Sequence, residues 1–225
     1  MGILDVIGPI MIGPSSSHTA GAAKIGFLAR LIYGKPIQNV EITLYNSFAK
    51  TGKGHGTDKA IIGGLLGMKM DDERIPTSFE IAKDQGLEFQ FILKQDLEKH
   101  PNETKIEIIE TNLGENYSIS GYSIGGGNAK IVEINGMKVD FSGKHDMLLI
   151  TYLDVPGMIG YIGEILGDNH INIAYVQISR DASIGRAMAI LKLDDFCTPD
   201  IVLKLCENKN IVKAISFPRL GGYLS

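Results

Sequence analysis

A histidine surrounded by hydroxyl groups is the part of this sequence best suited to chemistry. The run Gly13–Thr19 reads Gly-Pro-Ser-Ser-Ser-His-Thr and leads into an apolar stretch that ends at Tyr33, with Gly34 after it. The Gly-Pro pair predicts a turn, the Ser/Thr cluster a helix N-cap, and Gly34 the C-terminal stop. One hydroxyl is enough for a cap, so two interpretations of the surplus hydroxyls and His18 stay open: an elaborate cap, or a site for a carboxylate or phosphate.

A second segment repeats these ingredients. Thr51–Lys59 contains three glycines, His55, Thr57 and Asp58, and precedes a helical run that starts at Ala60. We expect a glycine-rich loop in which Thr57 or Asp58 caps the helix, while His55 stays available for proton transfer or hydrogen bonding. A plain surface loop is the alternative. Because a histidine and a hydroxyl precede a helix twice, a functional role is favoured.

A third glycine cluster, Gly125–Gly127, lies between two expected strands and is followed by Asn128. It does not open a helix with dinucleotide-binding spacing, and no Walker-type lysine follows it, so nucleotide binding is disfavoured. A tight bend or bulge is the structural interpretation. A close approach to a ligand or a partner chain is the functional one.

Composition excludes several classes of function. The chain has 225 residues, 44% of them hydrophobic and 21% charged, with a formal net charge of −4, which is typical of a globular protein without a nucleic-acid-binding surface. It lacks a membrane-spanning apolar run and a signal sequence, so we expect a cytoplasmic protein. His100, His145 and His170 are expected at the surface, and no pattern predicts a metal held by this chain alone.

The two cysteines are Cys197 and Cys206. Placed in one predicted helix, nine positions apart, they point to opposite faces and should neither form a disulfide nor share a metal. We expect two reduced thiols. An iron–sulfur cluster cannot be built from the thiols of this chain alone.

The fold class predicted from periodicity is α+β in two domains, with the boundary near residue 145. Residues 1–145 should form a mixed α+β domain with an antiparallel or mixed sheet, and residues 146–225 a ferredoxin-like βαββαβ domain. The expected helices of the first domain are 18–33 and 57–68, and its strands are 40–46, 87–93, 105–111, 117–122 and 129–134. The expected elements of the second are strands 147–153, 171–179, 186–193 and 211–217 and helices 156–167 and 199–206.

The three motifs, in this order and spacing, resemble the beta chain of the two-subunit, iron–sulfur-dependent bacterial L-serine dehydratases. The resemblance covers nearly the whole chain, and the C-terminal βαββαβ unit looks like the ACT domain of these chains. It implies conversion of L-serine to pyruvate and ammonia without pyridoxal phosphate, on a [4Fe-4S] cluster whose unliganded iron takes the serine hydroxyl as a Lewis acid. The cluster is then expected on the alpha chain, and this chain should be inactive alone. Asn128 departs from the apolar or basic residue expected after the three glycines.

Under this resemblance, the two histidines of the motifs, His18 and His55, are candidates for proton transfer or hydrogen bonding, and the sequence does not rank them. The expected substrate-binding residues, which would hold the carboxylate or complete the pocket, are Ser16, Ser17, Thr19, Thr57 and Asp58. The N-terminal domain also resembles the allosteric substrate-binding domain of some phosphoglycerate dehydrogenases. That leaves open a non-catalytic, amino-acid-sensing regulatory subunit.

The ACT-like domain carries its own candidate site. In ACT domains, amino acids commonly bind near the loop after the first strand, between paired domains, which implies Asp154, Pro156, Gly157 and Asn172 as residues for a regulatory ligand such as L-serine. Turn formation and capping are the alternative roles of these residues. The resemblance also implies self-association through this domain.

Overall fold

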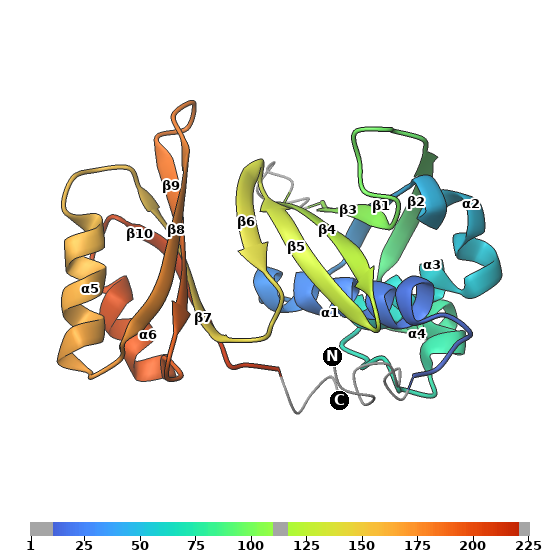
Figure 1. The fold of residues 1–225 in the computed structure, drawn as a ribbon, viewed down its shortest axis with the longest axis horizontal. Helices are drawn as coiled ribbons and strands as arrows, with labels where there is room; N and C mark the ends of the chain where they lie inside the picture. Colours follow the sequence, from blue (N-terminus) through green and yellow to red (C-terminus); the bar gives the residue numbers. More distant parts are fainter. Residues whose placement is uncertain (1–10, 110–116, 221–225) are drawn as a thin grey trace. The chain divides into compact units, whose positions relative to one another are not determined.

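The computed structural model describes residues 11–109 and 117–220 of the chain. It contains two sheets with helices and divides into two compact units, one ending at Gly136 and one beginning at Met137 (Figure 1). The predicted α+β class is confirmed. The division falls before the expected position near 145, because the polar stretch after Asn135-Gly136 contains a strand rather than a linker.

The sheet of the first unit is mixed. Its strand order within the first unit is β2-β1-β3-β4-β5. β1 pairs parallel with β2 and antiparallel with β3, and β4 pairs antiparallel with β3 and β5. The strands are β1 (Asn39–Tyr45), β2 (Glu88–Lys94), β3 (Glu103–Ile108), β4 (Tyr117–Gly125) and β5 (Asn128–Ile134). The next strand, β6 (Met137–Phe141), begins the second unit. The end of the expected strand 105–111 lies outside the described residues.

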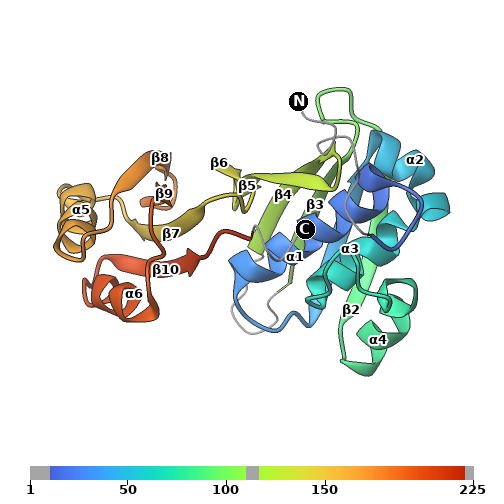
Figure 2. The same cartoon turned by 60° about the horizontal axis from the view of Figure 1, so that its bottom comes forward.

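Helices cover one face of this sheet (Figures 1 and 2). They are the π-helical turn η2 (Ser16–Ala20), α1 (Gly21–Tyr33), α2 (Asn46–His55), α3 (Thr57–Leu65), the 3-10 turn η3 (Ile75–Thr77) and α4 (Ser78–Asp84). The first helix ends as expected, because Gly34 adopts φ 76° and donates its N–H to the carbonyl of Arg30.

Two glycines let α1 and α3 touch backbone to backbone. A Cβ placed on Gly64 would lie 2.1 Å from the carbonyl oxygen of Ala23, and one on Gly26 would lie 2.3 Å from the carbonyl oxygen of Ile61. No larger side chain fits at either position unless the helices separate. This contact brings the starts of the two helices, and therefore the two histidine motifs, to the same end of the unit.

One expectation about local structure was wrong. Thr51–His55, expected as a glycine-rich loop, is helical and forms the second half of α2, and only Gly56 breaks the helix, with φ 68°. The N-terminus of α2 is held from outside: the side-chain amide of Asn46 donates to the carbonyls of Asp96 (2.7 Å) and Lys99 (3.0 Å). These tertiary contacts outweigh the low helix propensity of glycine.

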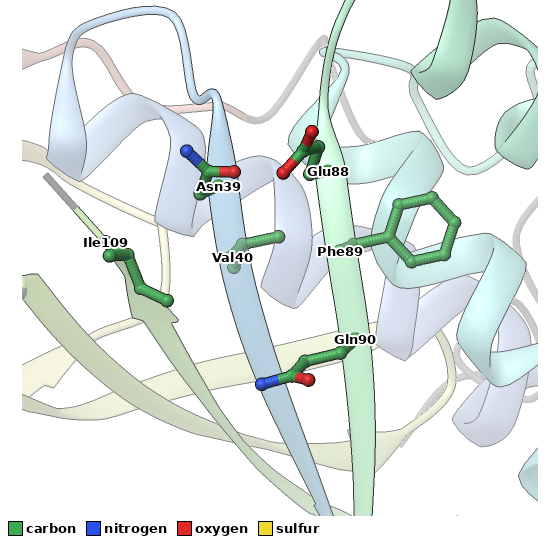
Figure 3. A pocket seen from close by; sticks show the side chains of 6 residues that line it. All are labelled: Asn39, Val40, Glu88, Phe89, Gln90 and Ile109. Carbon is green, nitrogen blue, oxygen red and sulfur yellow. The ribbon is translucent and has the colours of Figure 1, made fainter. Parts of the chain in front are cut away.

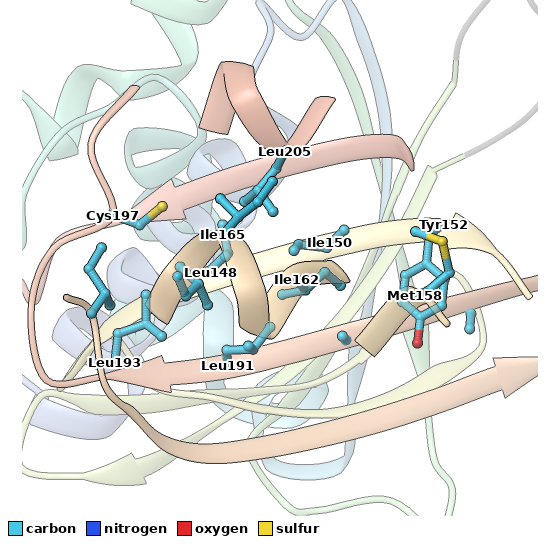
Figure 4. Packing of buried hydrophobic residues seen from close by; sticks show 14 residues of the cluster. Leu148, Ile150, Tyr152, Met158, Ile162, Ile165, Leu191, Leu193, Cys197 and Leu205 are labelled. Carbon is cyan, nitrogen blue, oxygen red and sulfur yellow. The ribbon is translucent and has the colours of Figure 1, made fainter. Parts of the chain in front are cut away.

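The second unit contains the predicted βαββαβ order. Its sheet has the order β10-β7-β9-β8 and is antiparallel throughout, which is the ferredoxin-like topology. α5 and α6 pack on one face through an apolar core that includes Leu148, Ile162, Ile165 and Leu205 (Figure 4). The elements are β7 (Asp146–Leu153), α5 (Met158–Asp168), β8 (Ile173–Asp181), β9 (Arg186–Leu193), α6 (Pro199–Cys206) and β10 (Ile211–Phe217).

The cysteines do not share a helix. Cys197 precedes α6 and is buried in the core of the second unit, whereas Cys206 is the exposed last residue of α6. Both thiols are free, as expected. Burial raises the pKa of Cys197 to about 11, so this sulfur stays a neutral, core-packing thiol.

None of the helices in the described part of the chain is both long enough and apolar enough to cross a membrane.

The α1–α3 contact leads to a stability prediction. Replacing Gly64 by alanine should lower the free energy of unfolding by about 1–3 kcal/mol, because the new methyl group would overlap the backbone of α1. The matched control is Gly163→Ala in α5, where a Cβ meets nothing within 4 Å and alanine should raise helix stability by about 0.5–1 kcal/mol. Urea denaturation of the two variants measures both changes. Equal effects would contradict the close packing of α1 on α3.

Candidate active site

The three sequence motifs meet at the start of α1. The hydroxyl of Thr19 donates to the carbonyl of His55 (2.9 Å), which joins the first motif to the second. The N–H of Gly127 donates to the carbonyl of Ser16 (3.2 Å), which joins the first to the third. The glycine cluster is thus both a hairpin bend and a point of close approach to the serine-rich turn.

The serine-rich turn uses its hydroxyls internally. Ser15 is the cap, because its Oγ accepts the backbone N–H of His18 (3.1 Å), and its Oγ also lies 3.3 Å from that of Ser17. Ser17 Oγ lies 3.0 Å from Nδ1 of His18. The expected surplus of hydroxyls is therefore partly used to orient the histidine and to hold the next motif.

His18 has a hydroxyl on each ring nitrogen. Ser17 Oγ lies at Nδ1, and Ser47 Oγ lies 3.0 Å from Nε2. A neutral imidazole offers one donor and one acceptor, and a hydroxyl can act as either, so both nitrogens are satisfied without a charge. The ring also meets Phe48 edge to face, with the centroids 5.3 Å apart. His18 is therefore fixed in place by contacts on all these sides.

His55 is held on one nitrogen only. Its Nδ1 lies 3.1 Å from the carbonyl oxygen of Thr51, one helical turn earlier in α2. A carbonyl only accepts, so Nδ1 carries the hydrogen and the neutral ring keeps its lone pair on Nε2. Within residues 11–109 and 117–220, Nε2 has no hydrogen-bond partner. This tautomer is the one a general base at Nε2 requires.

The two imidazoles influence each other's charge. Their ring centroids lie 5.1 Å apart. Burial lowers the pKa of His18 below its ordinary value of 6.5, and repulsion from a protonated His55 lowers it further. At neutral pH His18 is therefore uncharged, which agrees with its two hydroxyl partners.

Two of the remaining expected substrate-binding residues lie at the start of α3. Thr57 is completely buried, and its hydroxyl has no hydrogen-bond partner in the described chain. The Asp58 carboxylate accepts the N–H of Lys59 (2.8 Å) and lines a cavity beside α2. Neither side chain is the α3 cap, because the N-cap position is occupied by Gly56. Ser16 contributes its backbone carbonyl.

Several residues of the site carried no signal in the sequence. Ser47 and Phe48 contact His18, and the backbone N–H groups of both lie against the carbonyl of Pro101. Beside Pro101, His100 was expected at the surface but is half-buried and stacked on Tyr122, with ring centroids 4.3 Å apart. These residues come together only because the start of α2 is hydrogen-bonded to the loop that contains His100 and Pro101.

The loop of His100 also touches the third motif. The N–H of Ser123 donates to the carbonyl of Asn102 (3.0 Å), and Oδ1 of Asn102 is buried without a hydrogen-bond partner in the described chain. Ser123 itself packs on the first residue of α1, where a Cβ on Gly21 would lie 2.1 Å from its Oγ. A residue larger than glycine at position 21 would therefore push the β4–β5 hairpin away from the start of α1.

A cavity of about 220 Å³ between β1 and β2 lies elsewhere and has no histidine in its lining (Figure 3). It is bordered by Asn39, Val40, Glu88, Phe89, Gln90 and Ile109. The amide of Gln90, one of these residues, donates to the carboxylate of Glu41.

The expected regulatory residues of the second unit do not meet within one chain. Asn172 precedes β8, whose first residue pairs with Leu193 at the end of β9. Asp154 follows β7, whose last residue pairs with Arg186 at the start of β9. The two residues therefore lie at opposite ends of the sheet, and one site can contain both only if it is shared by two chains.

Each of these polar residues also has a local partner. The Asp154 carboxylate binds the Arg180 guanidinium (2.7 Å), and the Asn172 amide donates to the Asp194 carboxylate (2.7 Å). Gly157, after Pro156, is the N-cap of α5 with φ 90°. Turn formation and capping are thus visible roles for this segment.

The residues present do not fit an iron–sulfur cluster. One thiol is buried in the core of the second unit and the other is exposed at the end of α6. Among the described residues, no group of three or more His, Cys, Asp or Glu side chains is placed to hold a metal ion.

Comparison with known proteins identifies the family. Residues 3–86 match the family model described as serine dehydratase beta chain. The chain is 40% identical to a probable L-serine dehydratase beta chain of Bacillus subtilis, over 94% of this chain and 95% of that protein. It is 48% identical to the L-serine dehydratase beta chain of Peptoniphilus asaccharolyticus, over 75% of this chain and 76% of that protein.

A different enzyme shares part of the sequence. The D-3-phosphoglycerate dehydrogenase of Bacillus subtilis is 30% identical over 88% of this chain but only 38% of its own length. The beta chains, by contrast, match along most of both sequences. The protein is therefore a member of the family of L-serine dehydratase beta chains.

Proposed function

We propose that this chain supplies the proton-transfer half of an L-serine deaminase whose other half is an alpha chain. The observation that carries the proposal is the open Nε2 of His55, on a ring whose tautomer is set by the Thr51 carbonyl. Conversion of L-serine to pyruvate and ammonia requires loss of the α-proton, and a neutral histidine with an exposed lone pair is suited to accept it.

The two histidines take different roles. His55 is the proton acceptor, because its Nε2 is available to substrate. His18 is a positioning and hydrogen-bonding residue, because hydroxyls occupy both of its nitrogens. The His18 ring is neutral and lies with its centroid 5.1 Å from that of His55, so it places no positive charge beside the proposed base.

The partner chain completes the reaction. Elimination also needs a leaving hydroxyl, and the [4Fe-4S] cluster implied by the sequence resemblance would supply Lewis acidity toward it from the alpha chain. Support comes from the two cysteines of this chain: one thiol is buried and the other exposed, and neither belongs to a group of metal-binding side chains among the described residues. It follows from this proposal that the isolated chain is inactive.

A regulatory role of the second unit is a separate proposal. Its ferredoxin-like topology supports the ACT-domain resemblance. Because Asp154 and Asn172 lie at opposite ends of one sheet, we propose that L-serine binds them only where two chains associate through this unit. A non-catalytic, amino-acid-sensing subunit would keep this site but would not need the open nitrogen of His55.

The first prediction concerns the base. His55→Gln keeps a polar side chain but cannot accept a proton, so turnover of the enzyme reconstituted anaerobically with an alpha chain should fall by about 10²- to 10⁴-fold. His18→Gln should cost less, because His18 acts through its neighbours. Lys50→Gln, exposed on the same helix, should behave like the wild type. Full turnover in both histidine variants would contradict the proton-transfer proposal and favour the non-catalytic, amino-acid-sensing subunit.

The second prediction concerns charge. In the free chain, NMR titration of the ring C–H signals should give His18 a pKa below 6.5. His55→Gln removes the like charge but not the burial, so it should raise the pKa of His18 part of the way toward 6.5. A group whose pKa is depressed by folding is protonated more readily in the unfolded chain, so its contribution to stability is present above pH 6.5 and declines as the pH falls through this pKa. An unchanged His18 pKa in the variant would show that the rings are not coupled.

The third prediction concerns the second unit. If two chains form the L-serine site, calorimetric affinity for L-serine should increase with protein concentration in step with dimer formation measured by sedimentation. Asp154→Ala should weaken binding by removing the carboxylate that would face the ammonium group. Binding by a demonstrably monomeric chain would contradict the shared site.

A further inference from the structure

A second cavity lies beside α2 and is lined by the kind of groups that bind an amphipathic small molecule. Its volume is about 320 Å³, within the range of small-ligand sites. The apolar part of the lining consists of Phe48, Phe79 and Phe91 with two leucines and an alanine. Such a lining gains free energy when an apolar side chain replaces water.

Two opposite charges also line this cavity. Lys53 comes from the last turn of α2 and Asp58 from the first turn of α3, on either side of the Gly56 break. In the described part of the chain, the Lys53 ammonium has neither a hydrogen-bond nor an ion-pair partner, and Asp58 uses one oxygen on the N–H of Lys59. One cation and one carboxylate therefore remain available to a ligand that carries both charges.

We propose that this cavity binds a free α-amino acid with an apolar side chain. The ligand carboxylate would pair with Lys53, its ammonium group with Asp58, and its side chain would lie against the partly exposed rings of Phe79 and Phe91, whereas Phe48 is fully buried in the lining. Charge complementarity favours a zwitterion over a neutral hydrocarbon, because a neutral ligand would leave both charges without partners. This assignment also accounts for Asp58, which the histidine site does not use.

The cavity and the histidine site share a wall. Phe48 lines the cavity and at the same time meets the His18 ring edge to face. The helix that carries Phe48 and Lys53 also carries Ser47 and His55. A ligand in the cavity therefore changes the surroundings of His18 without touching it, and the His18 ring reports occupancy.

The test is calorimetry on the full chain with L-leucine and L-phenylalanine. Both should bind, whereas leucinamide, N-acetyl-L-leucine and glycine should bind at least about tenfold more weakly, because each lacks one of the three recognised groups. Lys53→Met should weaken leucine binding by a similar factor, and Ala49→Phe should abolish it by filling the cavity. Lys50→Met on the same helix, outside the lining, is the matched control.

The position is checked by NMR, since leucine should shift the ring C–H signals of His18 in the wild type and not in Ala49→Phe. Absence of binding by either amino acid would overturn the proposal, as would equal affinities of Lys53→Met and Lys50→Met. Equal binding of leucinamide and leucine would also overturn it, and would point instead to an apolar side chain of a partner. None of these measurements needs deaminase activity, so they stand whether or not the proposed reaction is confirmed.

Discussion

The site of this protein depends on the direct backbone contact between α1 and α3. Gly26 and Gly64 let each helix approach the peptide groups of the other, and the two helices run in the same direction from a common end. At that end the serine-rich turn meets the end of α2, so the two histidine motifs become one cluster although 36 residues separate Thr19 from its partner His55. Larger residues at these glycines would separate the motifs before any catalytic group was altered.

In the second unit, the periodicity of apolar residues was sufficient to predict the strands, the helices and their βαββαβ order. Each strand and helix there has an apolar pattern that can be read without knowing its tertiary contacts. The first unit was predictable in its motifs but not in their contacts. Thr51–His55 looked like a loop because its glycines have low helix propensity. The hydrogen bonds that hold the start of α2 run from Asn46 to the carbonyls of Asp96 and Lys99, which are 50 and 53 positions away in the sequence. Ser47 and Phe48 become site residues only through that helix.

The helical form of Thr51–His55 also gives the His55 ring a fixed hydrogen-bond partner. In a flexible loop, neither His55 nitrogen would have a fixed partner. In α2, the carbonyl of Thr51 lies one turn before the ring and holds the hydrogen on Nδ1. The same helix places Ser47 on His18. The roles proposed for the two histidines therefore rest on the different hydrogen bonds that one helix gives them.

Helix α2 also relates the second cavity to the proposed reaction. A ligand beside Phe48 and Lys53 would contact one face of a helix whose other contacts orient both imidazoles. Because a helix is stiff along its axis, a small displacement of Phe48 would also move Ser47 and the Thr51 carbonyl. These two groups hydrogen-bond to His18 and His55, so both imidazole rings would be affected. Gly56 ends α2 without any side chain to brace it. The Asn46 amide holds the N-terminus of the helix, and the Thr19 hydroxyl holds the carbonyl of His55 at its C-terminus, so a molecule bound beside Phe48 and Lys53 would act on the turns between these two anchors.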